Sequence, residues 1–162
     1  TPTPLALKVI SKRDQDPEQL ALTRLEVSIH ASVPRHPNIV RLLEWHEDAD
    51  ALYLVLERCD YGDLFDLVLA PPATPANTPI ASALAACHSV GVFHRDLKPE
   101  NVLLAGPLDA QGYPLVARLA DFGLATRESF SLELGLGTRS YLAPECLDDR
   151  LDGYVSAPAD VF

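Results

Sequence analysis

The sequence "HRDLKPEN" at residues 94–101 restricts the fold of this chain more than any other stretch. It brings Asp96, Lys98 and Asn101 within a few positions of one another. Pro99 keeps Lys98 out of helical geometry, because a proline ring clashes with a helical residue directly before it. A helix would also send the three side chains in divergent directions. The chain must therefore hold a carboxylate, an ammonium and an amide together on a short irregular loop.

The composition describes one globular domain with an acidic balance. Of 162 residues, 48% are apolar, which is enough for a sizeable core. The formal net charge of −10 argues against a nucleic-acid or anionic-membrane surface, because phosphate groups would be repelled on approach. We expect neither kind of partner, and an anionic substrate would need a local cationic site.

The cysteines favour an intracellular protein. Cys59, Cys87 and Cys146 are odd in number and lack CxxC spacing, so neither a disulfide framework nor a zinc site is supported. The most apolar run, residues 80–93, is too short to span a bilayer, and no signal sequence opens the chain. We expect a cytoplasmic or nuclear location.

A strand and a helix are predicted near the start of the chain. Residues 5–10, "LALKVI", form an apolar run typical of a strand, on which Lys8 shares one side with Ala6. Asp16 followed by Pro17 marks the start of a helix. That helix carries a stripe predicted to face a core, made of Leu22, Leu25, Ile29 and Val33.

Glu26 falls inside this apolar stripe, where a carboxylate is costly unless a cation or donors meet it. Two interpretations remain open. In the first, favoured on position alone, Glu26 lies at a helix edge and reaches solvent. In the second, Glu26 forms an ion pair with Lys8, which lies on the buried side of the nearby strand.

The remaining elements are predicted from short apolar runs separated by turn residues. We expect two strands, 36–47 and 51–59, around the turn "DADA". A short helix (61–70), a proline-rich linker (71–79) and a helix ended by Gly91 (80–90) should follow. Two further strands are expected at 101–104 and 115–120. From residue 121 to about residue 140 the chain is predicted to be irregular.

The order of the motifs is more specific than any one of them. "LALK", a helical Glu26, "HRDLKPEN", "DFG" and "APE" follow one another as in the protein-kinase signature set. The chain therefore resembles the eukaryotic-type protein kinase family over nearly its whole length. Lys98 and Thr138 are similar to the serine/threonine class, and the local sequence resembles fungal protein kinases. The resemblance implies an α+β, two-lobed fold with the ATP cleft between the lobes.

The resemblance also implies roles for the charged residues. Lys8 would hold the α and β phosphates of ATP, with Glu26 holding Lys8 in place. Asp96 would orient the acceptor hydroxyl and take its proton, with Lys98 steadying the γ phosphate. The two remaining polar groups, Asp121 and Asn101, would bind Mg²⁺.

Further residues are assigned by the same resemblance. For the adenosine they are Ala6 above the ring, Leu103 below it, Leu56 as gatekeeper, the backbone of Glu57 and Cys59 as hinge, and Asp63 near the ribose. His94 and Phe122 would pack as spine residues, and His30 occupies a usually apolar spine position. Arg95 is placed to pair with a phosphorylated loop. The activation-loop candidates are Ser129, Ser131 and Thr138.

The sequence also departs from the family pattern. We expect a chain truncated at both ends, without the strands of the glycine-rich loop and without the large-lobe helices that begin near Asp160. Residues 1–70 would form a remnant small lobe, hinge and first large-lobe helix, residues 71–79 a linker, and residues 80–162 a remnant large lobe. The isolated piece is expected to have little or no activity.

The function expected of the parent protein is serine/threonine kinase activity, with ATP and Mg²⁺ as cofactors and a protein as substrate. The alternative is a noncatalytic, pseudokinase-like or truncated module that binds a nucleotide or a partner. The presence of Lys8, Glu26, Asp96, Asn101 and Asp121 favours the enzyme.

Overall fold

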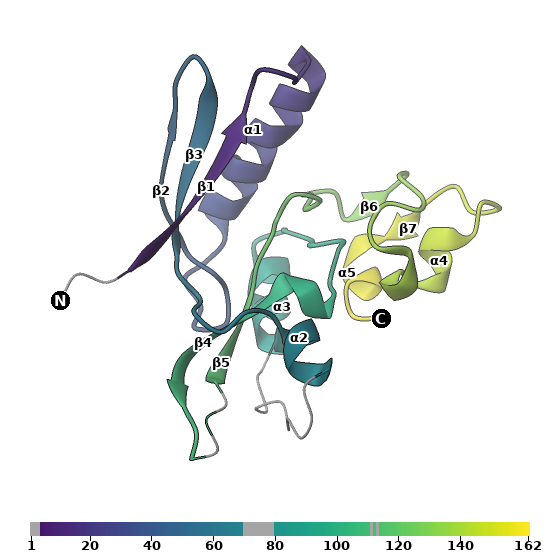
Figure 1. The fold of residues 1–162 in the computed structure, drawn as a ribbon. Helices are drawn as coiled ribbons and strands as arrows, with labels where there is room; N and C mark the ends of the chain where they lie inside the picture. Colours follow the sequence, from purple (N-terminus) through teal and green to yellow (C-terminus); the bar gives the residue numbers. More distant parts are fainter. Residues whose placement is uncertain (1–3, 70–79, 111, 113) are drawn as a thin grey trace.

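The computed structural model describes residues 4–69, 80–110, 112 and 114–162. The predicted linker, residues 71–79, lies outside these described residues. Figure 1 shows a first sheet with helix α1 beside it, a central part that contains α2, α3 and the β4–β5 pair, and a group formed by β6, β7, α4 and α5. Strands and helices are both present, as the α+β prediction requires.

The first sheet has the strand order β1-β3-β2, and both pairings are antiparallel. Its strands are β1 (Leu5–Ser11), β2 (Leu42–Glu47) and β3 (Ala51–Glu57). The predicted strand pair is confirmed, although the second strand begins only at Leu42. In the β1–β3 register Ala6 lies opposite Leu56 and Lys8 lies opposite Leu54. Residues assigned to the adenine site and to the phosphate site are therefore neighbours on this sheet.

Helix α1 (Pro17–Ser32) begins where the sequence predicts. The Asp16 carboxylate accepts hydrogen bonds from the backbone N–H groups of Glu18 and Gln19, at 2.9 and 2.8 Å. The Gln19 side chain in turn accepts from the Asp16 N–H at 3.1 Å. This reciprocal capping box and Pro17 in the first turn fix the helix start.

The predicted core stripe of α1 is only partly right. Leu22 and Leu25 are 62% and 48% exposed, whereas Ile29 is fully buried. The prediction assumed one core, but α1 is buried against two. Val27 packs with β1 and β3 residues, and Ile29 packs in a separate cluster with Phe122. Two contact faces on different sides of one helix leave Leu22 and Leu25 outside both cores.

The central part contains α2 (Leu64–Leu69), α3 (Ile80–Ser89) and the antiparallel pair β4 (Val102–Leu108) and β5 (Pro114–Leu119). Helix α3 ends as predicted, because Gly91 adopts a φ of 67° and donates its N–H to the His88 carbonyl at 3.0 Å. The strands predicted at residues 101–104 and 115–120 are present as β4 and β5, although β4 extends to Leu108.

The last third of the described chain has little regular structure. A two-stranded sheet joins β6 (Phe130–Ser131) to β7 (Tyr154–Val155), which was not predicted. The other short elements are the 3₁₀ turns η1 (Pro99–Asn101) and η2 (Arg139–Tyr141) and the helices α4 (Pro144–Leu147) and α5 (Ser156–Ala159). A strand pair of two residues carries too short a pattern to be recognised.

The segment after α1 attaches the first sheet to the central part. The N–H of Val40 donates to the Leu119 carbonyl, and the N–H of Leu119 donates to the Asn38 carbonyl, both at 2.8 Å. Ile29, Ile39, Leu119 and Phe122 belong to one buried cluster. The end of β5, where "DFG" begins, is thereby held close to α1. Within the described residues, no helix is long and apolar enough to cross a membrane.

Candidate active site

The Lys8–Glu26 pair of the second interpretation is present. Lys8 Nζ donates to Glu26 Oε1 at 2.7 Å, and the Glu26 side chain is only 12% exposed. Burial lowers the pKa of Lys8, but the Glu26 and Asp121 carboxylates outweigh burial and leave that pKa raised. Lys8 is therefore a fixed positive charge, and it explains how a carboxylate is accommodated inside an otherwise apolar stripe.

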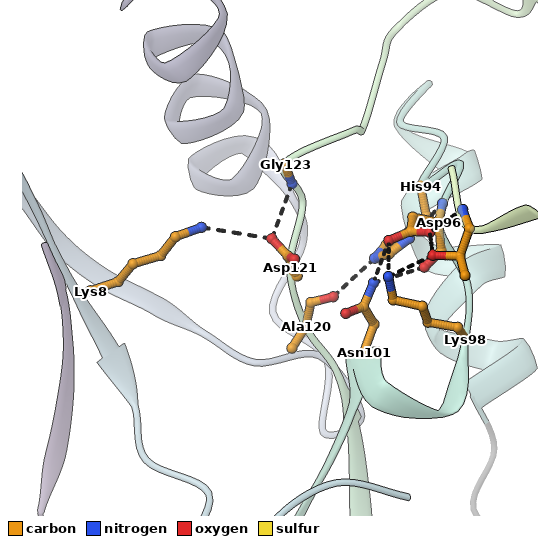
Figure 2. Close-up of polar contacts among 9 residues, drawn as sticks. Lys8, His94, Asp96, Lys98, Asn101, Ala120, Asp121 and Gly123 are labelled. Atoms are coloured by element: carbon orange, nitrogen blue, oxygen red, sulfur yellow. Dashed lines mark hydrogen bonds and ion pairs between the residues drawn. The ribbon is translucent and has the colours of Figure 1, made fainter. Parts of the chain in front are cut away.

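Asp121 faces Lys8 from the other side. The distance from Lys8 Nζ to Asp121 Oδ1 is 3.6 Å, and Figure 2 shows the two side chains pointing toward one another across the space below α1. Asp121 has a φ of 60°, and only one other non-glycine residue of the described chain, Arg95, has a positive φ. Such backbone conformations cost about 1–3 kcal/mol and often accompany functional sites.

Asp96, Lys98 and Thr138 form a closed set of contacts. Lys98 Nζ lies 2.7 Å from Asp96 Oδ2 and donates to Thr138 Oγ1 at 2.7 Å. The Thr138 hydroxyl and N–H both donate to Asp96 Oδ1, at 2.7 and 2.9 Å. Burial raises the pKa of Asp96, but the bonds from Lys98 and Thr138 leave that pKa lowered. The carboxylate is held ionised and in one orientation.

Asn101 joins Asp96 to the segment that carries Asp121. Its Nδ2 donates to the Asp96 backbone carbonyl at 2.8 Å and to Asp96 Oδ2 at 3.0 Å. The Asn101 carbonyl accepts from the Ala120 N–H at 2.8 Å. Figure 2 shows Asn101 between Asp121 and the Asp96–Lys98 pair. The amide and Asp121, twenty residues apart in sequence, therefore lie on neighbouring segments.

Asp160 anchors the loop at residues 94–101, although it lies far from that loop in the sequence. Its carboxylate accepts from the N–H groups of His94 and Arg95, at 2.8 and 2.6 Å. His88 Nε2 lies 2.8 Å from Asp160 Oδ2. Asp160 was not among the site residues expected from the sequence. An acid near the chain end gives no signal of a partner some 65 residues earlier.

A stack of rings supports Phe122 of "DFG". The His30 and Phe122 centroids are 4.6 Å apart and stacked, and the His94 ring meets the Phe122 ring edge-on at 5.2 Å. Burial lowers the pKa values of both His30 and His94. His30 Nε2 contacts the Val40 carbonyl at 2.8 Å and His94 Nε2 the Ala120 carbonyl at 3.0 Å. Neutral rings therefore fill these positions, with one nitrogen bonded to the backbone.

Comparison with known proteins decides the family. The protein kinase domain model matches residues 1–162. The chain belongs to the eukaryotic-type protein kinase family, in its serine/threonine class. The kinase is 37% identical to serine/threonine-protein kinase ksp1 of Schizosaccharomyces pombe, over 100% of this chain and 36% of that protein.

Two further relatives show the breadth of the family. The same yeast's "Negative regulator of sexual conjugation and meiosis" is 38% identical over 87% of this chain and 30% of its own length. Calcium-dependent protein kinase 9 of Oryza sativa subsp. japonica is 44% identical over 88% of this chain and 26% of its own length. The kinase chain thus spans about a third or less of these relatives, and the predicted resemblance to fungal kinases is confirmed.

Of the residues assigned to the adenosine, Ala6 and Leu56 lie opposite each other on the first sheet and Leu103 lies on β4. Ala6, Leu56 and Leu103 are half-buried. The Glu57 side chain pairs with Arg118 at 3.1 Å. Among the described residues, none shares a backbone hydrogen bond with Cys59.

Asp63 has a structural partner of its own. Its Oδ1 accepts from the Asp66 N–H at 2.9 Å, at the start of α2. Among the described residues, this cap is the one hydrogen bond found for the Asp63 side chain. A structural cap and a ligand contact are compatible at this position.

The oxygen atoms of Asp121 and Asn101 suit an open magnesium site better than a metal site built entirely from protein side chains. The described residues include no group of three or more His, Cys, Asp or Glu side chains that could hold a metal ion. Protein kinases generally use ATP and Mg²⁺, and Mg²⁺ keeps several waters and takes one or two protein oxygens plus substrate phosphates. Asp121 and Asn101 supply a carboxylate and an amide oxygen, which is a donor set of that kind.

The activation-loop candidates have different surroundings in the kinase. Thr138 bonds to Asp96 and Lys98, as described above. Ser129 is exposed, whereas Ser131 is fully buried in the β6–β7 pair. Arg95 NH1 contacts Glu133 Oε2 at 2.5 Å and Ser131 Oγ at 3.4 Å. Glu133 was not singled out from the sequence, because no motif includes it.

Proposed function

We propose that the protein containing this chain transfers the γ-phosphate of ATP to serine or threonine hydroxyls of a protein substrate. The observation that carries this proposal is the set of bonds around Asp96. A carboxylate held by Lys98, Thr138 and Asn101 is ionised, oriented and close to further cations, which phosphoryl transfer requires.

Each residue has a role in this proposal. Asp96 orients the acceptor hydroxyl and accepts its proton, and its lowered pKa keeps it available as a base. Lys98 neutralises charge on the γ phosphate, and its pKa, raised by Asp96, keeps it protonated. Lys8, oriented by Glu26, binds the α and β phosphates.

The same proposal includes a magnesium site and a nucleotide site. Asp121 and Asn101 would hold Mg²⁺, which neutralises phosphate charge when bound. Ala6, Leu56 and Leu103 would enclose the adenine, the Glu57–Cys59 backbone would bond to it, and Asp63 would lie at the ribose.

Two coarser predictions remain part of the proposal. We propose that residues 1–70 form a remnant small lobe, the hinge and the first large-lobe helix, that residues 71–79 form a linker, and that residues 80–162 form a remnant large lobe. We also propose an intracellular location, cytoplasmic or nuclear. Three free cysteines, two of them buried, support that location because they form no disulfide framework.

Phosphotransfer by the protein at its natural length tests the proposal. The Asp96→Asn variant should lower kcat by about 10³-fold, since the proton acceptor and its charge are lost. Asp152→Asn, an exposed acid outside the site, is the matched control and should leave kcat unchanged. The measurement is transfer of labelled phosphate from Mg·ATP to a serine- and threonine-rich protein.

The outcomes separate the enzyme from a binding module. Transfer that is lost in Asp96→Asn and kept in Asp152→Asn supports the kinase. Nucleotide binding with no transfer in the wild-type protein would contradict it and favour the noncatalytic alternative. Equal transfer in both variants would remove Asp96 from the mechanism.

A further inference from the structure

Arg95 is a nearly buried cation directly before Asp96. Its side chain is 9% exposed, and its backbone φ is 64°. Arg95 Nε donates to the Leu124 carbonyl, just after "DFG", at 2.6 Å. A guanidinium is always charged, and a cation taken out of water needs an anion beside it. Arg95, on the catalytic loop (residues 94–101), therefore requires a negative partner. The nearest candidate source is the activation segment, residues 121–145 from "DFG" to "APE".

Glu133 supplies that anion. Its Oε2 lies 2.5 Å from Arg95 NH1, and among the described residues no other acid forms an ion pair with Arg95. The Glu133 N–H also donates to Ser131 Oγ at 3.2 Å, while Ser131 Oγ is 3.4 Å from Arg95 NH1. The Ser131 hydroxyl thus contacts both the Glu133 backbone and the guanidinium, which keeps Glu133 beside Arg95.

We propose that Glu133 does for this kinase what a phosphate on the activation segment would otherwise do. It neutralises Arg95 and anchors the segment against the catalytic loop, so activity does not depend on phosphorylation of Ser129 or Ser131. This inference rests on the proposed kinase function. A phosphate orders such a segment by adding an arginine-pairable charge, and here the pairing charge is part of the chain.

The position of Ser131 supports the same conclusion. Ser131 is fully buried, and its strand β6 pairs with β7. A kinase acting on Ser131 would have to separate these strands first. The Ser129 carbonyl accepts from the Ser156 N–H at 3.0 Å, which fixes the backbone of that residue too. A phosphate on the exposed Ser129 side chain would have to displace a carboxylate already in contact with Arg95.

The path from Glu133 to the chemistry is short. Arg95 is the residue before Asp96, its N–H bonds to Asp160, and its Nε bonds to Leu124 in the segment after Asp121. Losing the Glu133 charge therefore loosens the Arg95 contacts that set both the Asp96 loop and the "DFG" segment. Glu133 acts through Arg95, so it is a positioning residue and not a catalytic one.

Dephosphorylated protein at its natural length provides the first test. The wild-type protein, Glu133→Gln, Glu133→Asp and the control Glu128→Gln are treated with phosphatase, and phosphate occupancy is checked by mass spectrometry. The Glu128 side chain is exposed on the same segment. Kinetics are measured at varied ATP.

The expected pattern is specific. Dephosphorylated wild-type protein and Glu128→Gln keep full kcat. Glu133→Gln loses about 10-fold in kcat with little change in KM for ATP, because the loss concerns orientation and not nucleotide binding. Glu133→Asp recovers most of kcat. A dephosphorylated wild-type protein that is inactive, or a Glu133→Gln protein that behaves like Glu128→Gln, would overturn the proposal.

A second measurement separates this proposal from the kinase function itself. If no variant or wild-type protein shows Asp96-dependent transfer, the proposed function fails. The anchoring role is then decided by hydrogen exchange of the amides of residues 124–135. Faster exchange in Glu133→Gln than in Glu128→Gln supports the anchor, and equal exchange overturns it. Glu133 is 61% exposed, so its substitution leaves the core intact.

Discussion

The catalytic loop and the Lys8 side of the cleft are held in different ways. The Asp96 side chain is 11% exposed and is fixed by Lys98, Thr138 and Asn101. The Lys8 side chain is 41% exposed and has one close contact, with Glu26, and a longer one with Asp121. The Asp96 region is cross-linked by several hydrogen bonds, whereas the Lys8 region depends on one close ion pair and one longer ion pair.

This difference indicates which side chains are already fixed before a substrate binds. On the proposed function, the groups that would orient the hydroxyl are positioned before any substrate binds, so they would lose little freedom in the reaction. Lys8 keeps water contact and could adjust to the phosphates. The same difference predicts that stability depends on the supports of the loop, while Lys8 matters for activity far more than for stability.

The largest expected effect on stability is at the anchor of the loop. Asp160→Ala removes the acceptor of two backbone N–H groups, and the Asp160 side chain is only 1% exposed. Leaving these buried donors unpaired should cost roughly 3 kcal/mol of unfolding free energy. Urea unfolding at pH 7.5 measures the loss, with the exposed Asp152→Ala as control. A loss equal to that of the control would show that the loop is held by other contacts.

Lys8→Met tests the other region. Activity should fall about 10²-fold, because a cation aimed at the phosphates is lost. The free energy of unfolding should fall by about 2 kcal/mol, less than for Asp160→Ala, because Lys8 itself is 41% exposed but its loss leaves the 12% exposed Glu26 without a cation. Lys12→Met is the matched control, because Lys12 loses an ion pair to Glu47 outside the site. Steady-state kinetics measure the loss of activity, and urea unfolding measures the loss of stability. A stability loss as large as that of Asp160→Ala would show that the Lys8 region supports the fold as strongly as the Asp160 anchor does.

Local patterns predicted most elements of the fold. The strand around Lys8, the helix that starts at Asp16-Pro17 and the helix ended by Gly91 are present, because capping groups and periodicity act within a few residues. The burial of the helix was predicted less well. Leu22 and Leu25 are exposed because α1 serves two cores, and no periodicity reveals how many layers surround a helix.

The site could be predicted only where a motif marks it. Asp96, Asn101 and Asp121 come from ordered motifs, and the structure brings them close together. Asp160 and Glu133 lie outside any motif, and their partners are 65 and 38 residues away in sequence. Contacts of that separation are set by tertiary packing, which a single sequence does not encode in a local pattern.

The smallest effect concerns the ring stack that joins the two regions. Burial lowers the pKa of His30, so the folded state binds its proton less readily than the unfolded state does. The stability contributed by neutral His30 should therefore be complete above about pH 6.5, the ordinary pKa of histidine, and should decrease as the pH falls toward the lowered pKa of the folded state. His94, whose pKa burial also lowers, adds to the same decrease.

His30→Leu should make stability less sensitive to acid. The leucine fills the space beside Phe122 and cannot be protonated, but it leaves the Val40 carbonyl without its 2.8 Å partner, which costs about 1 kcal/mol at pH 7.5. Urea unfolding at pH 7.5 and 5.5 gives the pH-dependent loss for each protein. That loss should be smaller in His30→Leu yet still present, because His94 remains. If the loss is the same in both proteins, protonation of His30 does not contribute to the decrease in stability at acid pH.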